Sequence, residues 1–197
     1  MTGQDGFIAG GFKAARLALE DAVARAGLHL KPTTLALSTL RRARRTVKLV
    51  ETVLRRLILL IAASLDLPDV TPRKTADADR KRTHVARPRG FVLVPPLGGD
   101  VSRLEGLERR RRLPERDRNA TGTLLERLET LFRLLDDPSQ AARRMARIIA
   151  RLKAQRAMKP VVPPQGGLFR ERADFSLVAE ALPDRVNRAL EDWYDSS

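Results

Sequence analysis

Residues 33–67 read TTLALSTLRRARRTVKLVETVLRRLILLIAASLDL, and this stretch decides the fold. Its apolar residues recur in alternating steps of three and four, a spacing that predicts one long α-helix with a heptad-patterned seam, as in a coiled coil. Thr33 or Thr34 can cap the start and Pro68 marks the end, so about 33 residues would span roughly 50 Å. The residues assigned to the seam are Leu40, Ala43, Val47, Val50, Leu54, Leu57 and Ile61.

The apolar face of this helix widens along its length. From Val53 onward the positions beside the seam, including Ile58 and Leu60, are apolar as well. The early half is therefore expected to contact one partner helix, and the late half to be buried on most sides. The partner helix would come from the N-terminal part of the same chain or from another protein, either a second copy or a different chain. Leu40, Val47, Val50, Leu54, Leu57 and Ile61 are the candidate contacts.

Three further helical regions flank the long helix. A first helix is expected from about Gly11 to Ala26, with Gly27 as a natural stop. Residues 123–158 form two apolar stripes separated by Asp137-Pro138, which predicts a hairpin of antiparallel helices lying side by side. A last helical region begins near Ser176, with a kink or a restart at Pro183.

Residues 68–122 differ in character, because prolines interrupt them, charged residues are dense, and the one short apolar island is FVLV at residues 91–94. We expect this segment to be a largely disordered basic linker. The fold class is therefore all-α: a small helical bundle with one long helix, a helical hairpin and an irregular basic linker. The expected division is 11–67, 68–122 and 123–195, with the first and last parts packing together.

The motif VPPxGG occurs twice in the chain. It stands at residues 94–99 as VPPLGG and at residues 162–167 as VPPQGG. Each copy would be a short polyproline-like segment that runs into a flexible turn. The two copies are either a paired docking or hinge element or two ordinary loops, and the sequence favours the loops.

The net charge of +14 is concentrated in particular segments. Residues 41–56 carry seven basic groups against one acid, and residues 138–159 carry seven against none. Residues 160–197 are acidic, with four basic groups against seven acids. Such a distribution suits nucleic acid, an anionic membrane surface or an acidic protein. A compositional origin of the arginines, without a function, stays equally open.

The helix after Asp137 separates its arginines from its apolar residues. At about 100° per residue, Arg143, Arg144, Arg147 and Arg151 fall within roughly 0–100° on the helical wheel, and the apolar set falls within roughly 140–260°. Four guanidinium groups on one side could bind phosphates. The alternatives are a solvated face, or neutralisation by the acidic residues of the tail.

A second basic cluster precedes the apolar half of the long helix. It comprises Arg41, Arg42, Arg44, Arg45 and Lys48, and the four arginines are candidates for anion or phosphate binding. With the apolar residues that follow, the segment 41–65 also resembles an interfacial membrane anchor. The continuing heptad pattern favours the simpler interpretation, a seam whose exposed side is charged.

No pattern of catalytic residues, metal ligands or cofactor-binding residues stands out, and the chain has no cysteine. We therefore expect a non-enzymatic interaction or adaptor protein without cofactor, catalytic or metal site, located in the cytoplasm. The alternatives are sequence-nonspecific nucleic-acid binding through the arginine-rich helix and linker, and peripheral association with an anionic membrane at its inner face.

Overall fold

The computed structural model describes residues 3–65, 120–154, 161–166 and 171–195. Within these ranges the chain is helical and has no strand, apart from an isolated bridge between Thr34 and Ala120. This confirms the all-α fold class. The elements are α1 (Gly3–Arg25), the 3₁₀ turn η1 (Leu28–Leu30), α2 (Leu37–Ala63), α5 (Gly122–Asp136), α6 (Ser139–Ala154) and α7 (Ala173–Asp195).

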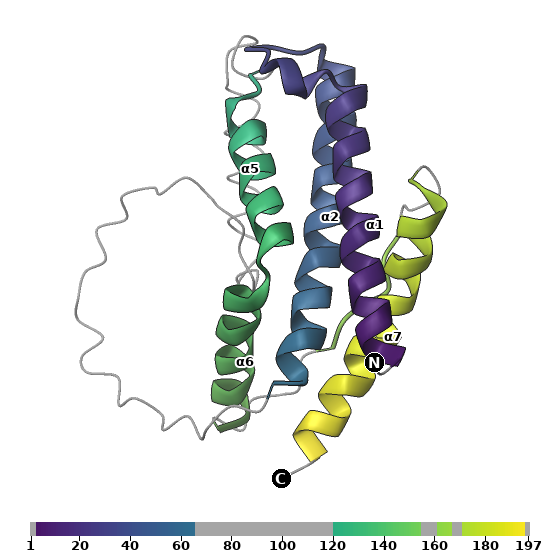
Figure 1. The fold of residues 1–197 in the computed structure, drawn as a ribbon, viewed down its shortest axis with the longest axis vertical. Helices are drawn as coiled ribbons and strands as arrows, with labels where there is room; N and C mark the ends of the chain where they lie inside the picture. Colours follow the sequence, from purple (N-terminus) through teal and green to yellow (C-terminus); the bar gives the residue numbers. More distant parts are fainter. Residues whose placement is uncertain (1–2, 66–119, 155–160, 167–170, 196–197) are drawn as a thin grey trace, which may run out of the picture.

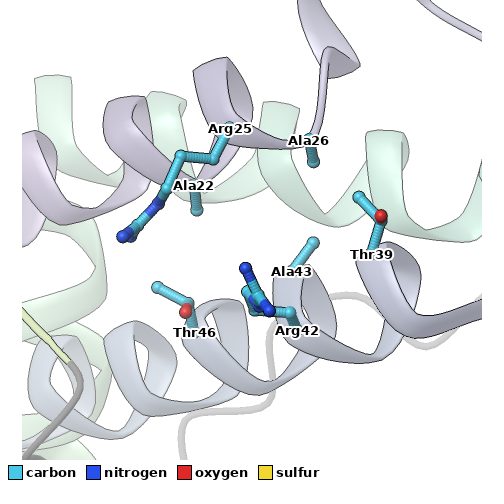
Figure 2. A pocket seen from close by; sticks show the side chains of 7 residues that line it. All are labelled: Ala22, Arg25, Ala26, Thr39, Arg42, Ala43 and Thr46. Carbon is cyan, nitrogen blue, oxygen red and sulfur yellow. The ribbon is translucent and has the colours of Figure 1, made fainter.

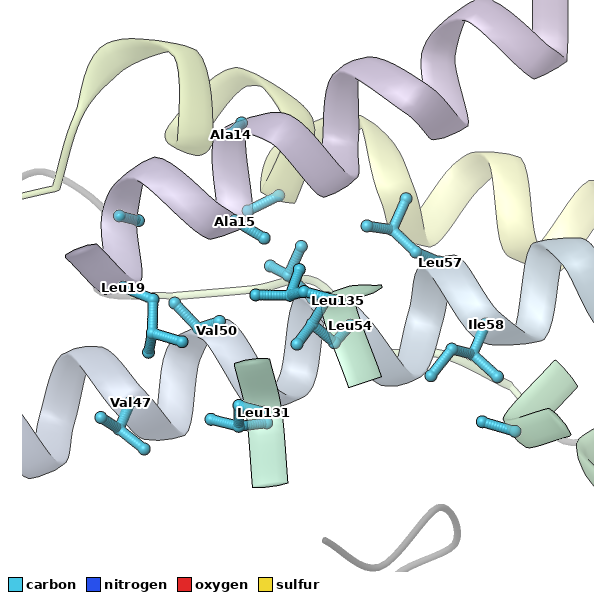
Figure 3. Packing of buried hydrophobic residues seen from close by; sticks show 14 of the residues in the cluster. Ala14, Ala15, Leu19, Val47, Val50, Leu54, Leu57, Ile58, Leu131 and Leu135 are labelled. Atoms are coloured by element: carbon cyan, nitrogen blue, oxygen red, sulfur yellow. The ribbon is translucent and has the colours of Figure 1, made fainter. Parts of the chain in front are cut away.

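Helix α2 lies at the centre of the bundle. Figure 1 shows α1 and α7 on one side of it and α5 and α6 on the other. Its C-terminal half is buried on most sides, including Val53, Ile58 and Leu60, whereas its N-terminal half buries only a narrow stripe. The expected widening of the buried face is therefore observed, but the early half contacts both α1 and the region of α5 and not a single partner helix. The seam packs inside one chain, and Figure 3 shows Leu54 and Leu57 among residues of the neighbouring helices.

The start of α2 differs from the prediction. The helix begins at Leu37, after Ala36 at the N-cap position, and ends at Ala63, so it has 27 residues. Neither threonine caps it, because Thr34 pairs with Ala120 and the backbone carbonyl of Thr33 accepts a hydrogen bond from the amide of Thr121 at 3.2 Å. These residues instead attach the start of α5 beside the start of α2.

Helix α1 begins at Gly3, eight positions before the expected start at Gly11. Glycine is a poor helix former in isolation, so tertiary contacts must stabilise this first part. Gly11 is buried, and a methyl group placed there would lie 2.7 Å from Cδ2 of Leu57 and 3.3 Å from Cγ1 of Val178. Its missing side chain thus permits the close approach of α1 to α2 and α7.

The predicted hairpin of antiparallel helices is wrong. Asp137 and Pro138 do separate α5 from α6, and the carboxylate of Asp137 accepts a hydrogen bond from the amide of Ser139 at 3.0 Å, as expected of a helix cap. However, Figure 1 shows that α6 continues beyond α5 along the same side of α2 instead of folding back beside it. The two helices therefore act as one interrupted rod.

The phase of the apolar residues explains this arrangement. Steps of four and three run from Leu124 to Leu135 and continue through Pro138 into α6 without a shift. One unbroken stripe can contact a single partner rod, whereas a hairpin needs two stripes that face each other. The buried members of the stripe are Leu124, Leu128, Leu131, Leu135, Ala142, Met145 and Ile149.

The C-terminal helix α7 continues across Pro183 as one helix of 23 residues, so the predicted restart does not occur. The second VPPxGG copy lies against it. The side chain of Asn187 accepts from the amide of Val162 at 2.8 Å and donates to its carbonyl at 3.1 Å. Arg56 of α2 donates to the carbonyl of Pro163 at 2.6 Å. Val162 and Pro163 are therefore docked at the bundle.

Two sequence-based predictions cannot be compared with the structure. The first VPPxGG copy, residues 94–99, lies outside the described residues. The predicted linker 68–122 also lies outside them, except at its end, where residues 120–122 lead into α5.

Candidate anion-binding surfaces

The six residues proposed as a helix–helix seam lie in the interior of the bundle. Leu40, Val47, Val50, Leu54 and Leu57 are fully buried, and Ile61 is half-buried. Their contacts are made with helices of the same chain. Substitution of these residues would consequently report on the stability of the bundle, whatever partner the protein has.

The four arginines of α6 lie on the side of that helix that faces solvent. Arg143, Arg144, Arg147 and Arg151 are all exposed, and the buried residues of α6 lie on the opposite side, toward α2. Among the described residues, none of the four forms a salt bridge. We call these four residues the α6 ridge. Its guanidinium groups are available to a ligand without the loss of an internal ion pair.

The acidic residues of α7 do not cover the α6 ridge. Glu180, Asp184, Glu191 and Asp192 are exposed on α7. One contact between α6 and α7 is made by Lys153, whose Nζ donates to the carbonyl of Trp193 at 2.7 Å and lies 4.6 Å from the centre of the indole ring. The positive charge of the α6 ridge is thus not balanced by a direct carboxylate contact in the described part of the chain.

The second predicted cluster forms part of a recess between α1, α2 and the start of α7. The recess has a volume of about 580 Å³ and is lined by Arg25, Ser38, Arg41, Arg42, Arg45, Thr46 and Glu171. We call it the α1–α2 recess. A smaller pocket of about 60 Å³ adjoins it and shares Arg25, Arg42 and Thr46. Figure 2 shows this smaller pocket, with Arg25 on α1 and Arg42 on α2 at its sides.

The structure divides the predicted cluster. Arg41, Arg42 and Arg45 are exposed and line the recess. Arg44 is half-buried on another side of α2, where its Nη2 donates to the carbonyl of Ala120 at 3.3 Å. Arg44 therefore holds the segment before α5 and does not belong to the recess.

Besides Ser38 of α2, three residues of the recess were missed by sequence reasoning. Arg25 comes from the end of α1, and Glu171 precedes α7. Thr46 is buried, and its hydroxyl donates to the carboxylate oxygens of Glu171 at 3.2 and 3.4 Å. They lie far from one another in the sequence, so no local motif signals them. The only sequence signal was the basic charge near residue 41.

Other arginines serve the interior of the bundle. The buried carboxylate of Glu51 accepts from Arg127 at 2.6, 2.7 and 2.9 Å and lies 3.5 Å from Nη2 of Arg55. Burial lowers the pKa of Arg55, and the attraction of Glu51 opposes this effect. Burial also lowers the pKa of Arg56, whose Nη1 is buried without a hydrogen-bond partner.

No family model, curated protein or solved structure matches the chain. Within the described ranges, no helix combines the length and apolar character needed to cross a bilayer. The same ranges contain no group of three or more His, Cys, Asp or Glu residues arranged to hold a metal ion.

Proposed function

We propose that this protein is a non-enzymatic binding protein whose partner is nucleic acid, contacted at its phosphates through the α6 ridge. The observation that carries the proposal is the position of the ridge: four exposed arginines on one side of a helix, opposite its buried face. A guanidinium group donates two parallel hydrogen bonds to phosphate and keeps its charge at physiological pH. The ridge therefore has the chemistry that a phosphate backbone requires.

The dimensions of the ridge suit a nucleic-acid backbone. From Arg143 to Arg151 the helix rises about 12 Å. Duplex DNA carries one charge per roughly 1.7 Å of its axis, so about seven phosphate charges lie along that length. Contacts to the backbone carry no sequence information. Binding is therefore expected to be nearly independent of base sequence and strongly weakened by salt.

The membrane alternative has less support from the geometry. An interfacial helix must present an apolar face to the lipid. The apolar half of α2 is covered by other helices, and Leu57 and Ile58 are fully buried. Membrane association through residues 41–65 would require the bundle to open, whereas the α6 ridge is exposed without any rearrangement.

Salt-dependent binding to random-sequence duplex DNA tests the proposal, with fluorescence anisotropy measured between 50 and 200 mM salt on the full chain. The test variant is Arg143→Ala/Arg147→Ala. The matched control is Arg133→Ala/Arg188→Ala, which removes the same charge from exposed positions on α5 and α7. Each lost phosphate contact should reduce the slope of log K against log salt by about 0.9.

The proposal predicts that the slope of log K against log salt is smaller by about 2 in the ridge variant and changes much less in the control variant. Equal losses in the two variants would show that net charge, and not the ridge, determines binding. Absence of salt-dependent binding in the unmodified protein would remove nucleic acid as the partner.

A further inference from the structure

The α1–α2 recess is a concave surface that concentrates positive charge. Its lining contains four arginines and one glutamate, a formal excess of three positive charges. The arginines come from two helices: Arg25 ends α1, and Arg41, Arg42 and Arg45 follow the start of α2. Guanidinium groups that repel one another across a recess are stabilised when an anion lies between them.

We propose that the α1–α2 recess binds a small molecule that carries two or more linked phosphate groups. The recess shares no residue with the α6 ridge, so this proposal does not depend on the proposed function. A volume of about 580 Å³ is large enough for such a ligand, because small-molecule sites typically measure about 300–1,000 Å³.

The charges of the recess favour linked phosphates over a single one. Arg25 also pairs with Asp21 at 2.7 Å, and Arg45 has another interaction within the chain. Arg41 and Arg42 are therefore the most available cations of the recess. These two residues are neighbours in the chain, so their side chains leave α2 about 100° apart. An extended polyphosphate can contact both side chains at once, whereas a single phosphate group spans a shorter distance.

At Glu171 the proposal predicts a change in anion affinity opposite to the change expected at the arginines. Its carboxylate lines the recess and is held there by the buried hydroxyl of Thr46. A carboxylate repels an anionic ligand, and an amide of the same shape would keep an acceptor for the Thr46 hydroxyl. Glu171→Gln should therefore strengthen anion binding, while the loss of Arg41 and Arg42 should weaken it.

Isothermal titration calorimetry of the full chain with tripolyphosphate tests this site. The site variant is Arg41→Ala/Arg42→Ala, and the matched control is Arg133→Ala/Arg188→Ala, which removes the same charge from exposed positions on α5 and α7. We expect one tripolyphosphate per chain. Each arginine contact to a charged ligand should contribute about tenfold in affinity, so the site variant should bind about a hundredfold more weakly. Glu171→Gln should bind a few times more tightly, and the control variant should bind like the unmodified protein.

A second titration, with the protein saturated with duplex DNA, distinguishes a free polyphosphate from the nucleic-acid backbone. Unchanged tripolyphosphate affinity supports a separate small-molecule site. Competition by DNA would assign the recess to a nucleic-acid interface and overturn the proposal. Absence of binding, equal losses in the two arginine variants, or weaker binding by Glu171→Gln would also overturn it. Circular dichroism of each variant verifies that the helices are intact.

Discussion

The arginines of the bundle interior and those of the α6 ridge are the same residue type in two environments. Arg127 and Arg56 lie between helices and donate to groups of their own chain. The α6 ridge lies on the outer side of its helix, and its four members form no salt bridge within the described residues. The comparison teaches that arginines occur here in two environments: some guanidinium groups join helices, and others are exposed and form no salt bridge within the described residues.

The two groups of arginines should respond differently to substitution, because only the removal of an interior arginine leaves a buried charge without its partner. Glu51 is only 6% exposed, so it needs a cationic partner to stay charged inside the bundle. An exposed arginine leaves nothing buried when it is removed. Substitutions of interior arginines should therefore change the free energy of unfolding, and those of the ridge should change ligand affinity.

The largest expected effect is at the Glu51–Arg127 pair. Among the described residues, Arg127→Ala would leave the buried carboxylate of Glu51 with Arg55, at 3.5 Å, as its remaining salt-bridge partner. Breaking such a pair should lower the free energy of unfolding by about 3 kcal/mol, measured by urea denaturation. The value is at the low end for buried pairs, because the side chain of Arg127 is 38% exposed.

The control for this prediction is Arg147→Ala on the α6 ridge. It removes the same residue type from a helix of similar size and should change the free energy of unfolding by less than about 0.5 kcal/mol. If both variants lost similar stability, the distinction between interior and ridge arginines would be wrong.

A smaller effect is expected at Arg56. Arg56→Ala removes the packed stem and the hydrogen bond to the carbonyl of Pro163, and should lower the free energy of unfolding by about 2 kcal/mol. Arg56→Met keeps most of the stem and removes a desolvated charge whose Nη1 has no partner, so it should cost less than about 1 kcal/mol. Chemical denaturation of both variants measures the difference. Equal losses would show that the guanidinium group, and not its stem, stabilises this position.

The sequence alone predicts the most strongly periodic parts of the fold. The heptad spacing of α2 located a long helix, and the widening of its apolar face identified the half that is buried on most sides. These features follow from the period of the helix and need no knowledge of neighbouring helices. The ends of α2 were less predictable, since Thr33 and Thr34 contact the start of α5 instead of capping a helix.

Tertiary contacts decide the parts that were predicted wrongly. The short turn at Asp137-Pro138 suggested a hairpin, but the unbroken phase from Leu124 to Ile149 directs both helices toward α2. The part of α1 before Gly11 was also missed, and its residues Phe7 and Ile8 are half-buried against the core. The unbroken phase can be read along the sequence, whereas the contacts of Phe7 and Ile8 depend on where other elements lie.

The two candidate surfaces also differ in how far the sequence alone could predict them. All four arginines of the α6 ridge belong to one helix, so their common side followed from the spacing of residues 143–151. The α1–α2 recess combines Arg25, Glu171 and residues of α2, which only the folded chain brings together. Sequence reasoning therefore found part of the recess and included Arg44, which lies elsewhere.

The most direct test follows the Nε–Hε signals of individual arginines by NMR while duplex DNA is added to the full chain. The division of the arginines into two roles predicts that the signals of Arg143, Arg144, Arg147 and Arg151 shift progressively and return when salt is raised. The signals of Arg56 and Arg127 should stay in place. Shifts of the interior arginines with an unchanged ridge would contradict this division.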